Sequence, residues 1–333
     1  MDERMSLKMR RCLVTGGAGF IGSHIAERLL KDGHSVVVLD NFSSGKEENL
    51  SFIKNYDLSA ISYELIRGDI RDFSVCLKAC QQIDVIFHQA ALRSVPKSMS
   101  NPIEYNDVNI NGTINMLEAA RQQNVKRFIF ASSSSIYGET DRFPERETDL
   151  PKLISPYALT KLAGEYYCRV YAQNYDLPAA CLRYFNVFGP RQALDDEYAV
   201  VIPKFIHCLL NDEPPPIYDT GKQSRDFTYI DNVVEANFLA ANVPNLKWGV
   251  FNIANGHDRT VLELVSLLNK IMKKNIQPVH LPPRPGDVFK TLADISQAKE
   301  ILGYQPKIDF REGLARTVEW FVRKLGELEE LGE

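Results

Sequence analysis

Three glycines at three-residue spacing lie between an apolar segment and an amphipathic one near the start of the chain. Gly16, Gly19 and Gly22 fall where a short buried strand would turn into a helix. A backbone without side chains can approach a pyrophosphate, and the first turn of a helix offers it free N–H groups. The turn therefore predicts a dinucleotide site. Its G-x-x-G-x-x-G spacing differs from G-x-G-x-x-G, and the pattern alone would also fit an ordinary tight turn.

Short apolar runs alternate with amphipathic segments over the first 185 residues. They predict strands at 11–14, 35–39, 63–68, 84–88, 127–131 and 179–184. They predict helices at 23–31, 73–80, 103–123 and 155–173, the last with Ser155 as N-cap and Pro156 in its first turn. Continuous apolar strands separated by helices are typical of a parallel sheet covered on both faces. The predicted fold class is α/β, a Rossmann-like doubly wound parallel sheet.

The pattern changes after residue 185, where prolines gather at 214–216 and at 282, 283 and 285. Helices are expected there at 200–210, 231–241, 260–273, 296–302 and 313–325. We therefore expect a cofactor domain at 1–185, to which segments near 225–255 return. A smaller mixed α/β substrate domain is expected at 186–333.

Composition narrows the possible partners. The 333 residues carry a formal net charge of -4, so the chain has no general attraction to nucleic acid or to anionic membranes. No apolar run has the length of a membrane span, and the charged first residues lack the apolar core of a signal peptide. The six cysteines have no His/Cys pair at zinc spacing. We expect a cytoplasmic protein with no nucleic acid, membrane or metal partner.

Acidic residues follow two of the predicted strands. Asp40 comes after the second strand, where a carboxylate accepts hydrogen bonds from both ribose hydroxyls of adenosine and would repel a 2′-phosphate. This favours NAD over NADP. Asp69 follows the third strand and could hold the adenine, with Ile70 packing on the ring. As alternatives, Asp40 could be a helix N-cap or loop residue, and Asp69 a solvated loop residue.

A tyrosine and a lysine share one face of the helix predicted at 155–173. Tyr157 and Lys161 are four residues apart. A free tyrosine has a pKa of about 10, and a nearby ammonium and the positive nicotinamide ring would favour its phenolate. The serine run 132–135 follows the fifth strand, where side chains face a ligand crevice. Each motif alone is common, but with the glycine turn they predict hydride chemistry at a carbon bearing a hydroxyl.

These residues resemble the extended short-chain dehydrogenase/reductase family over essentially the whole chain. The segments that match its nucleotide-sugar epimerase branch are 15–24, 39–45, 68–72, 88–91, 111–113, 155–161 and 183–192. Three further segments, at 90–98, 224–230 and 284–288, are similar to UDP-N-acetylglucosamine 4-epimerases of the bacterial surface-polysaccharide type.

The resemblance implies NAD as cofactor, bound by residues 1–185, and a UDP-hexose as substrate, bound by residues 186–333. It implies that Ser133, Tyr157 and Lys161 are catalytic, with Lys161 also holding the nicotinamide ribose. The further cofactor-binding residues that it implies are Gly16, Gly19, Phe20, Ile21, Gly22, Asp40, Asn41, Ser44, Gly45, Asp69, Ile70, Gln89, Ala90, Ala91, Asn109 and Tyr184. The substrate-binding residues that it implies are Ser134, Asn186, Arg191, Val201, Tyr218, Arg225, Arg284, Asp287 and Thr291. Arginines suit a diphosphate because their hydrogen bonds are charge-assisted, although a lone arginine is more often a surface residue.

Three features bear on the reaction. Arg93 stands where several relatives have a small residue, and its role is open. Thr291, seven residues after Arg284, stands where galactose/glucose-restricted epimerases have a bulky tyrosine, so it leaves room for an N-acetyl group at C2. Serines follow Ser133, so the Asp-Glu pair of the dehydratases and the Glu of the UDP-glucuronate decarboxylases are absent.

We therefore expect an isomerase with bound NAD. It would interconvert UDP-N-acetylglucosamine and UDP-N-acetylgalactosamine through a 4-keto intermediate, in polysaccharide biosynthesis. The helices at 103–123 and 155–173 pack on a partner in relatives, which implies a homodimer. The sequence leaves open a UDP-glucose/UDP-galactose or UDP-glucuronate 4-epimerase, a net oxidoreductase that releases NADH, and an NAD-sensing binding protein. The intact serine, tyrosine and lysine set argues against the last.

Overall fold

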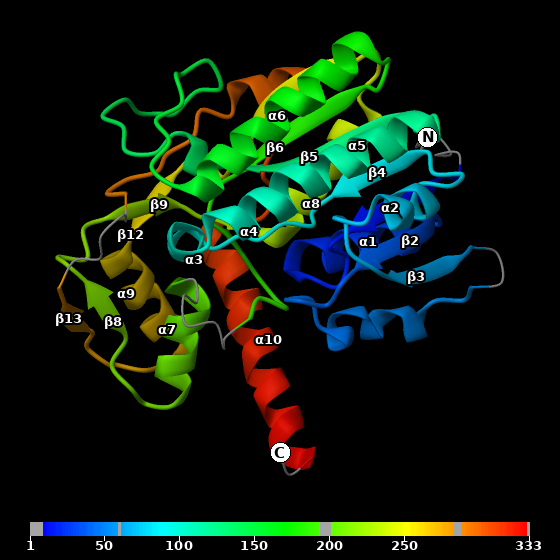
Figure 1. The fold of residues 1–333 in the computed structure, drawn as a ribbon. Coiled ribbons are helices and arrows are strands. Elements are labelled where there is room, and N and C mark those ends of the chain that lie inside the picture. The colour runs from blue at the N-terminus through cyan, green and yellow to red at the C-terminus, as the bar shows by residue number, and fades with distance from the viewer. Residues whose placement is uncertain (1–8, 59–60, 194–200, 283–287, 332–333) are drawn as a thin grey trace, which may run out of the picture.

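The computed structural model describes residues 9–58, 61–193, 201–282 and 288–331 (Figure 1). Seven of the described strands form one parallel sheet in the order β11-β6-β5-β4-β1-β2-β3. The strands are β1 (Arg11–Thr15), β2 (Ser35–Asp40), β3 (Tyr63–Arg67), β4 (Val85–His88), β5 (Arg127–Ser133), β6 (Ala179–Tyr184) and β11 (Trp248–Ile253). The order reverses between β1 and β4, so a crevice forms there at the carboxyl ends of the strands. The predicted Rossmann-like α/β class is confirmed.

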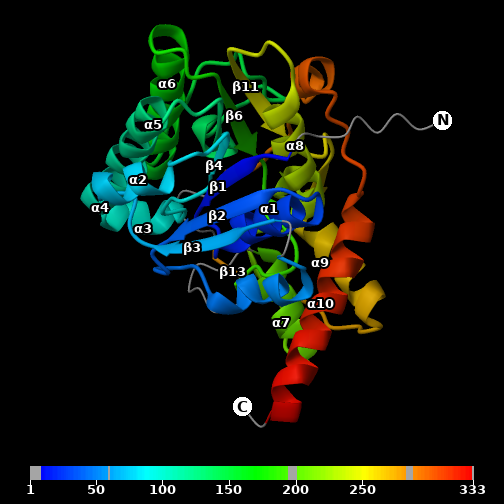
Figure 2. The same ribbon diagram turned by 90° about the vertical axis from the view of Figure 1, so that its right-hand side faces the viewer.

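Helices cover both faces of this sheet (Figure 2). One face carries α2 (Phe73–Ala79), α5 (Gly112–Gln122) and α6 (Pro156–Asn174), and the other carries α1 (Phe20–Lys31) and α8 (Ile230–Asn242). Successive side chains of a strand point to opposite faces, so Leu13 packs toward α2, α5 and α6 while Cys12 packs toward α1 and α8. Burial on both faces explains why the strands are apolar throughout.

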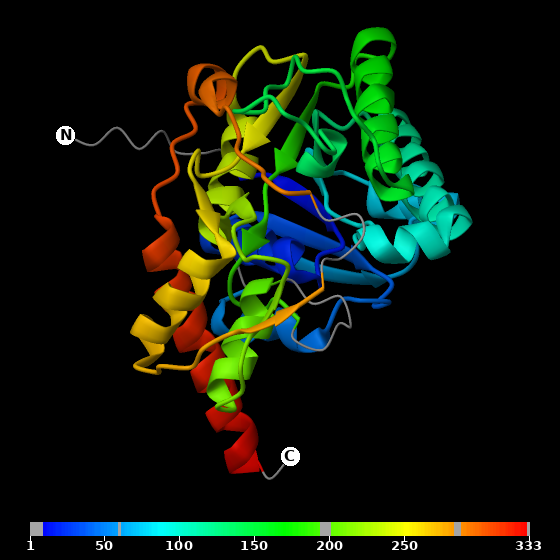
Figure 3. The ribbon, with the colours of Figure 1, turned by 90° about the vertical axis from the view of Figure 1, so that its left-hand side faces the viewer.

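The remaining elements form a smaller mixed part beyond the carboxyl ends of the strands (Figure 3). It contains α7 (Val201–Leu210), α9 (Val261–Met272), α10 (Phe310–Leu331) and the strand pairs β7 (Val187–Phe188) with β10 (Thr228–Tyr229), β8 (Pro216–Tyr218) with β13 (Val279–Leu281), and β9 (Ser224–Asp226) with β12 (Asp258–Thr260). One hydrophobic cluster runs from Val14 under the sheet to Leu264 and Leu314 in this part. The division into two domains at residue 185 stays a prediction.

Most of the predicted helices are present with shifted ends. The first begins at Phe20 rather than at residue 23, because Gly19 is its N-cap. The helix predicted at 103–123 is divided into α4 (Pro102–Asn106), a π-helical turn at Asp107–Asn111, and α5. In that turn the Asn109 side chain bonds the main chain of Leu92, a tertiary contact that helical periodicity does not reveal.

Some elements were not predicted. The helix α3 (Val95–Ser100) begins after Ser94, whose hydroxyl accepts a hydrogen bond from the Lys97 N–H at 3.2 Å. A 3₁₀ segment occupies Glu47–Asn55, and the helix predicted at 296–302 is π-helical over Ala298–Leu302. In the part of the chain that the structure describes, no helix is long and apolar enough to cross a membrane.

Candidate active site

The glycine turn is built so closely that side chains are excluded from it. Gly16 has φ +66° and donates its N–H to the Leu39 carbonyl at 2.8 Å. A Cβ on Gly16 would lie 2.8 Å from the Ala90 nitrogen, and a Cβ on Gly22 would lie 2.1 Å from the Gly16 carbonyl oxygen. Gly19 caps α1 with no side-chain hydrogen bond. The turn therefore brings the first N–H groups of α1 to the crevice, where an anion is stabilised.

A cavity of about 1360 Å³ extends from this turn to the smaller part. It exceeds the ~300–1,000 Å³ of most single-ligand pockets, so a dinucleotide and a second ligand can share it. The predicted site residues in its wall are Gly16, Gly19, Phe20, Ile21, Gly22, Asp40, Asn41, Ser44, Asp69, Ile70, Gln89, Ala90, Ala91, Ser133, Ser134, Tyr157, Lys161, Tyr184, Asn186, Arg191, Val201, Tyr218, Arg225 and Thr291. Gly45 and Asn109 do not line the cavity, and Arg284 and Asp287 lie outside the described residues.

The carboxylate of Asp40 is held at the end of β2. It accepts hydrogen bonds from the Ala18 N–H at 2.9 Å and the Phe42 N–H at 2.8 Å. A Cβ on Gly45 would lie 2.9 Å from the same carboxylate, so Gly45 packs closely against Asp40, which lines the cavity. This geometry fits the recognition of a ribose diol.

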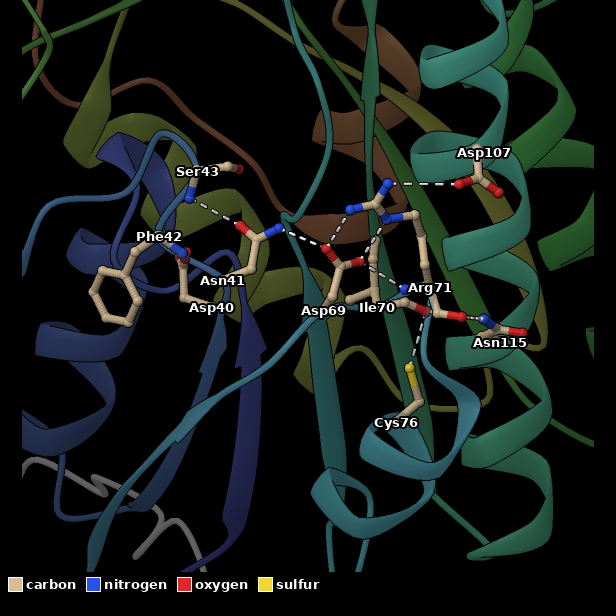
Figure 4. A network of polar contacts seen from close by, with 10 residues as sticks. All are labelled: Asp40, Asn41, Phe42, Ser43, Asp69, Ile70, Arg71, Cys76, Asp107 and Asn115. Atoms are coloured by element: carbon tan, nitrogen blue, oxygen red, sulfur yellow. Dashed lines mark hydrogen bonds and ion pairs between the residues drawn. The ribbon is translucent and has the colours of Figure 1, made fainter.

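The loop after β3 is fixed by a polar network (Figure 4). The Asp69 carboxylate accepts hydrogen bonds from Arg71 Nε at 3.0 Å, Arg71 Nη2 at 2.8 Å and Asn41 Nδ2 at 2.8 Å. Arg71 also reaches Asp107 at 3.6 Å, and Asn115 Nδ2 donates to the Ile70 carbonyl at 3.0 Å. The hydrogen bonds from Arg71 hold the pKa of the Asp69 carboxyl well below its usual range. Asp69 is therefore an ordered, charged acceptor rather than a freely solvated loop residue.

A buried histidine supports the wall between β1 and β4. His88 Nδ1 lies 2.7 Å from Thr15 Oγ1, and its Nε2 lies 3.0 Å from Thr113 Oγ1. Burial lowers the pKa of His88 to about 3, so the ring is neutral. Thr15 in turn accepts a hydrogen bond from the Ala90 N–H at 3.3 Å. The position of Ala90 at the cavity thus depends on a residue that the motif analysis did not single out.

The catalytic set meets where β5 ends beside the first turn of α6. The Ser133 hydroxyl lies beside the Tyr157 phenol and lowers its pKa, and Ser133 Oγ accepts a hydrogen bond from the Ser135 N–H at 3.2 Å. Lys161 Nζ lies 5.9 Å from the Tyr157 ring centre and donates to the Ala131 carbonyl at 2.8 Å. Predicted from separate motifs, these three side chains lie together in one wall.

Burial and two neighbouring side chains, Ser133 and Arg93, shift the pKa of Tyr157 in opposite directions. Burial raises the pKa of Tyr157, while the hydrogen bond from Ser133 and the charge of Arg93 lower it. The ammonium of Lys161 lies 5.9 Å from the Tyr157 ring centre and donates to the Ala131 carbonyl, and burial lowers the pKa of Lys161 to about 8. Arg93, whose role the sequence left open, lies in the cavity wall and favours the ionised tyrosine.

Hydrogen bonds connect several residues of the predicted substrate wall to one another and to the main chain. Asn186 Nδ2 donates to Thr291 Oγ1 at 2.9 Å, and Thr291 Oγ1 also accepts from the Asp226 N–H at 3.2 Å. Thr291 is buried, so its hydroxyl shapes the wall rather than reaching into the cavity. Arg225 lies against the Phe289 carbonyl at 3.2 Å. Arg191 is ion-paired with Glu27 of α1 and stacks on Phe52.

Asn237 and the ion pair of Glu165 and Arg183 are buried, contact residues of the site or their neighbours, and were not predicted from the sequence. Asn237 of α8 donates from Nδ2 to the Tyr184 hydroxyl at 2.9 Å, and Gln89 Nε2 donates to the same hydroxyl at 3.2 Å. Glu165 and Arg183 form a buried ion pair at 2.8 Å beside β5. The available signals were a glutamate four residues after Lys161, outside the matching segment 155–161, and an arginine just before Tyr184, inside the matching segment 183–192.

Metal ligands are not gathered in the part of the chain described here. No three His, Cys, Asp or Glu side chains lie together in a metal-binding group among those residues. The six cysteines are buried and form no disulfide.

Comparison with known proteins identifies the family to which this chain is related. The model of the NAD dependent epimerase/dehydratase family matches residues 12–254. UDP-glucose 4-epimerase of Mycolicibacterium smegmatis is 39% identical over 317 residues, which are 94% of this chain and 99% of that protein.

Two solved structures are similar over nearly the whole chain. UDP-N-acetylglucosamine 4-epimerase from Methanobrevibacter ruminantium M1, in complex with UDP-N-acetylmuramic acid, is 40% identical, has a TM-score of 0.89 and covers 96% of this chain and 100% of its own. UDP-glucuronic acid 4-epimerase from Bacillus cereus, in complex with UDP-glucuronic acid and NAD, is 35% identical, has a TM-score of 0.86 and covers 94% of this chain and 99% of its own. With the glycine turn, the ribose acceptor and the Ser133–Tyr157 contact already in view, the chain belongs to the NAD dependent epimerase/dehydratase family, and NAD is its cofactor.

Proposed function

We propose that the chain is a UDP-hexose 4-epimerase with UDP-N-acetylglucosamine and UDP-N-acetylgalactosamine as its preferred pair. The neighbouring side chains of Ser133 and Tyr157 carry this proposal, because they line the same cavity as the glycine turn and Arg225. A base placed between a hydride acceptor and an anchored sugar suits oxidation at a hydroxyl-bearing carbon.

The chemistry assigns a distinct role to each catalytic side chain. Tyr157 takes the proton of the sugar 4-hydroxyl, and Ser133 orients that hydroxyl. NAD, which the glycine turn and Asp40 would hold, would supply the hydride acceptor for C4 and the hydride donor for the 4-keto sugar. Lys161 holds the cofactor ribose, and its bond to the Ala131 carbonyl fixes the end of β5 beside α6.

Epimerisation requires one half of the substrate to stay fixed while the other turns over. Asn186, Arg225, Tyr218 and Val201 would hold the UDP half, together with Arg284 and Asp287. The sugar half meets smaller groups, Ser134 and the wall that Thr291 forms. Charged and numerous contacts to UDP, with few to the sugar, let the ring rotate without escape.

The choice of sugar rests on the side chain at residue 291. A threonine there, held against Asn186, leaves the space that a tyrosine would fill, which suits an N-acetyl group at C2. The similar 4-epimerase from Methanobrevibacter ruminantium M1 supports this choice. The relatives that act on UDP-glucose and UDP-glucuronic acid make these two sugars the alternatives.

We also propose a homodimer formed by α4 and α6. Apolar side chains are exposed on these helices in the single chain, with Ile103 85% exposed, Leu159 53% and Tyr166 56%. An isologous pair would cover them. Light scattering at micromolar concentration should give twice the chain mass, and a monomer would refute this assembly.

The first experiment is an incubation of the purified protein, without added cofactor, with UDP-N-acetylglucosamine and separately with UDP-glucose. Faster appearance of UDP-N-acetylgalactosamine than of UDP-galactose is expected on chromatography. Product from UDP-glucose alone would keep the mechanism and refute the argument from Thr291. Absence of product from both, and from UDP-glucuronate with added NAD, would refute the epimerase proposal. NADH released in step with product would indicate a net oxidoreductase instead.

A further inference from the structure

We propose that the buried ion pair of Glu165 and Arg183 is a positioning device that connects the catalytic serine and tyrosine to the sugar-side wall of the cavity. This inference rests on the proposed epimerisation. It assigns a task to Glu165 and Arg183, neither of which lines the cavity.

The near half of the device lies beside the catalytic strand end. Glu165 is on α6, one and two turns beyond Lys161 and Tyr157 on the same helix face. Its Oε1 accepts a hydrogen bond from Ser132 Oγ at 2.5 Å, and Ser132 immediately precedes Ser133. Helix and strand end are therefore tied together at the residue next to the catalytic hydroxyl.

Arg183 of β6 completes this half. It donates from Nε to Glu165 Oε1 at 2.9 Å and from Nη2 to Oε2 at 2.8 Å. The two side chains are only 5% and 4% exposed, so the fork-shaped pair is rigid and shielded from solvent. A buried pair is weak evidence for stability, so we infer that its task here is to hold the groups bonded to it in place.

The far half reaches the opposite wall. Arg183 Nη1 donates to the Tyr137 hydroxyl at 2.9 Å, and that hydroxyl donates to Asn252 Oδ1 at 2.6 Å. Asn252 Nδ2 then donates to the carbonyls of Glu145 at 2.9 Å and Asp294 at 3.1 Å.

The end of this chain of bonds is the segment that carries Thr291. The Glu145 N–H donates to the Leu292 carbonyl at 2.7 Å, and the Leu292 N–H donates to Glu145 Oε2 at 3.0 Å. An unbroken series of hydrogen bonds thus joins the residue beside Ser133 to the residue beside Thr291. Base and sugar wall would keep one spacing while the 4-keto ring turns over.

The test breaks each half of the device with a small change and a matched control. Ser132→Ala removes the link to β5 but leaves the ion pair, and Ser98→Ala is its control, since Ser98 is buried and donates only to the Val95 carbonyl. Tyr137→Phe removes the link to Asn252. Tyr304→Phe is its control, because that buried hydroxyl donates to the Ala254 carbonyl outside the cavity.

The expected result is a loss of kcat with KM retained. Because misplacement by ~1 Å can cost about 100-fold in rate, Ser132→Ala and Tyr137→Phe should lower kcat about 10- to 100-fold, with KM for the UDP-hexose changed less than about twofold. Bound NAD, measured by extraction, and the thermal unfolding midpoint decide whether each variant is folded. The controls should keep the wild-type kcat.

A second readout needs no sugar. Tyrosinate absorbance is titrated in the NAD-loaded protein, and the Tyr157→Phe curve in the same background is subtracted, which isolates Tyr157. The groups around this phenol are Ser133 from β5, Arg93 after β4, Tyr105 from α4 and Lys161 from its own helix. A loosened Ser133 should raise the midpoint by about 0.5–1 pH unit in Ser132→Ala, since a hydrogen bond to the phenolate is weakened.

If Ser132→Ala and Tyr137→Phe match their controls in kcat and in the tyrosinate titration, the proposal is overturned. A rise in KM alone would also overturn it, because it would mean lost binding rather than lost positioning. Wild-type protein that epimerises no UDP-hexose would refute the proposed function, while the titration would still decide the positioning of Tyr157.

Discussion

The substitution Gly22→Ala tests the glycine turn most directly. The added Cβ would lie 2.1 Å from the Gly16 carbonyl oxygen, 2.8 Å from the Gly16 carbonyl carbon and 2.9 Å from the Gly17 Cα, all of them backbone atoms. Ordinary contact begins at 3.4 Å, so α1 and the turn must separate by 3.4 − 2.1 = 1.3 Å. Overpacking of this kind costs about 1–3 kcal/mol and sometimes more, and we expect a loss near ~3 kcal/mol.

The same displacement moves the N–H groups of α1 away from the cofactor pyrophosphate. Hydrogen bonds to charged groups contribute about 1.5–3 kcal/mol each, so loss of one corresponds to at least a tenfold weaker binding of NAD. NAD retained through gel filtration, quantified after acid extraction, and the thermal unfolding midpoint measure the two effects. Gly326→Ala is the control, because its Cβ would meet nothing within 4 Å. A Gly22→Ala protein with full NAD content and the wild-type midpoint would refute the reasoning.

Three further predictions concern the chemistry. Tyr157→Phe should lower kcat by at least about 100-fold while the NAD content stays at the wild-type level; near-normal turnover would exclude Tyr157 as the base. Thr291→Tyr should fill the sugar space and leave Asn186 without its bond, so kcat/KM should fall more for UDP-N-acetylglucosamine than for UDP-glucose; an equal fall would remove the size argument. The folded pKa of Lys161 is lowered from 10.5 to about 8, so the unfolded chain binds more protons between these values. The difference in unfolding free energy between wild type and Lys161→Met should therefore increase in favour of wild type as pH rises from 8 to 10.5, and a flat difference in denaturant titrations would contradict the buried ammonium.

The sequence predicts local structure well where one local cause decides it. The glycines at 16, 19 and 22 leave few alternatives to a strand–turn–helix, and Ser155 with Pro156 marks the start of α6 within a residue. The spacing of Tyr157 and Lys161 likewise requires only a helix. Such features depend on residues that are neighbours along the chain.

Features that depend on residues distant in the chain cannot be predicted from the sequence in this way. In the π-helical turn at Asp107–Asn111, the Asn109 side chain is hydrogen-bonded to the main chain of Leu92. The hydroxyl of Thr291 accepts a hydrogen bond from Asn186. The hydrogen bond from Lys161 Nζ to the Ala131 carbonyl likewise joins residues thirty positions apart in sequence. Periodicity carries no information about such pairs, because tertiary contacts override local preference.

The ion pair of Glu165 and Arg183 shows the same limit. Arg183 lies inside a segment that matches the family and Glu165 lies four residues beyond another, yet nothing in the spacing indicates that α6 and β6 place them against each other. Only the order of strands in the sheet, with β6 next to β5, brings the two side chains to Ser132.

The shared hydrophobic cluster has a consequence for anyone who wishes to cut this protein into parts. Strand β11 pairs with β6, and α8 covers the same face of the sheet as α1. A fragment that ended at residue 185 would leave β6 with unpaired backbone groups and would uncover Val14 and Ile25. Exposed strand edges and apolar faces of this kind recruit other chains. The cofactor half is therefore not a transplantable module, and fusions or biosensors built on this scaffold need the segments from both ends of the sequence.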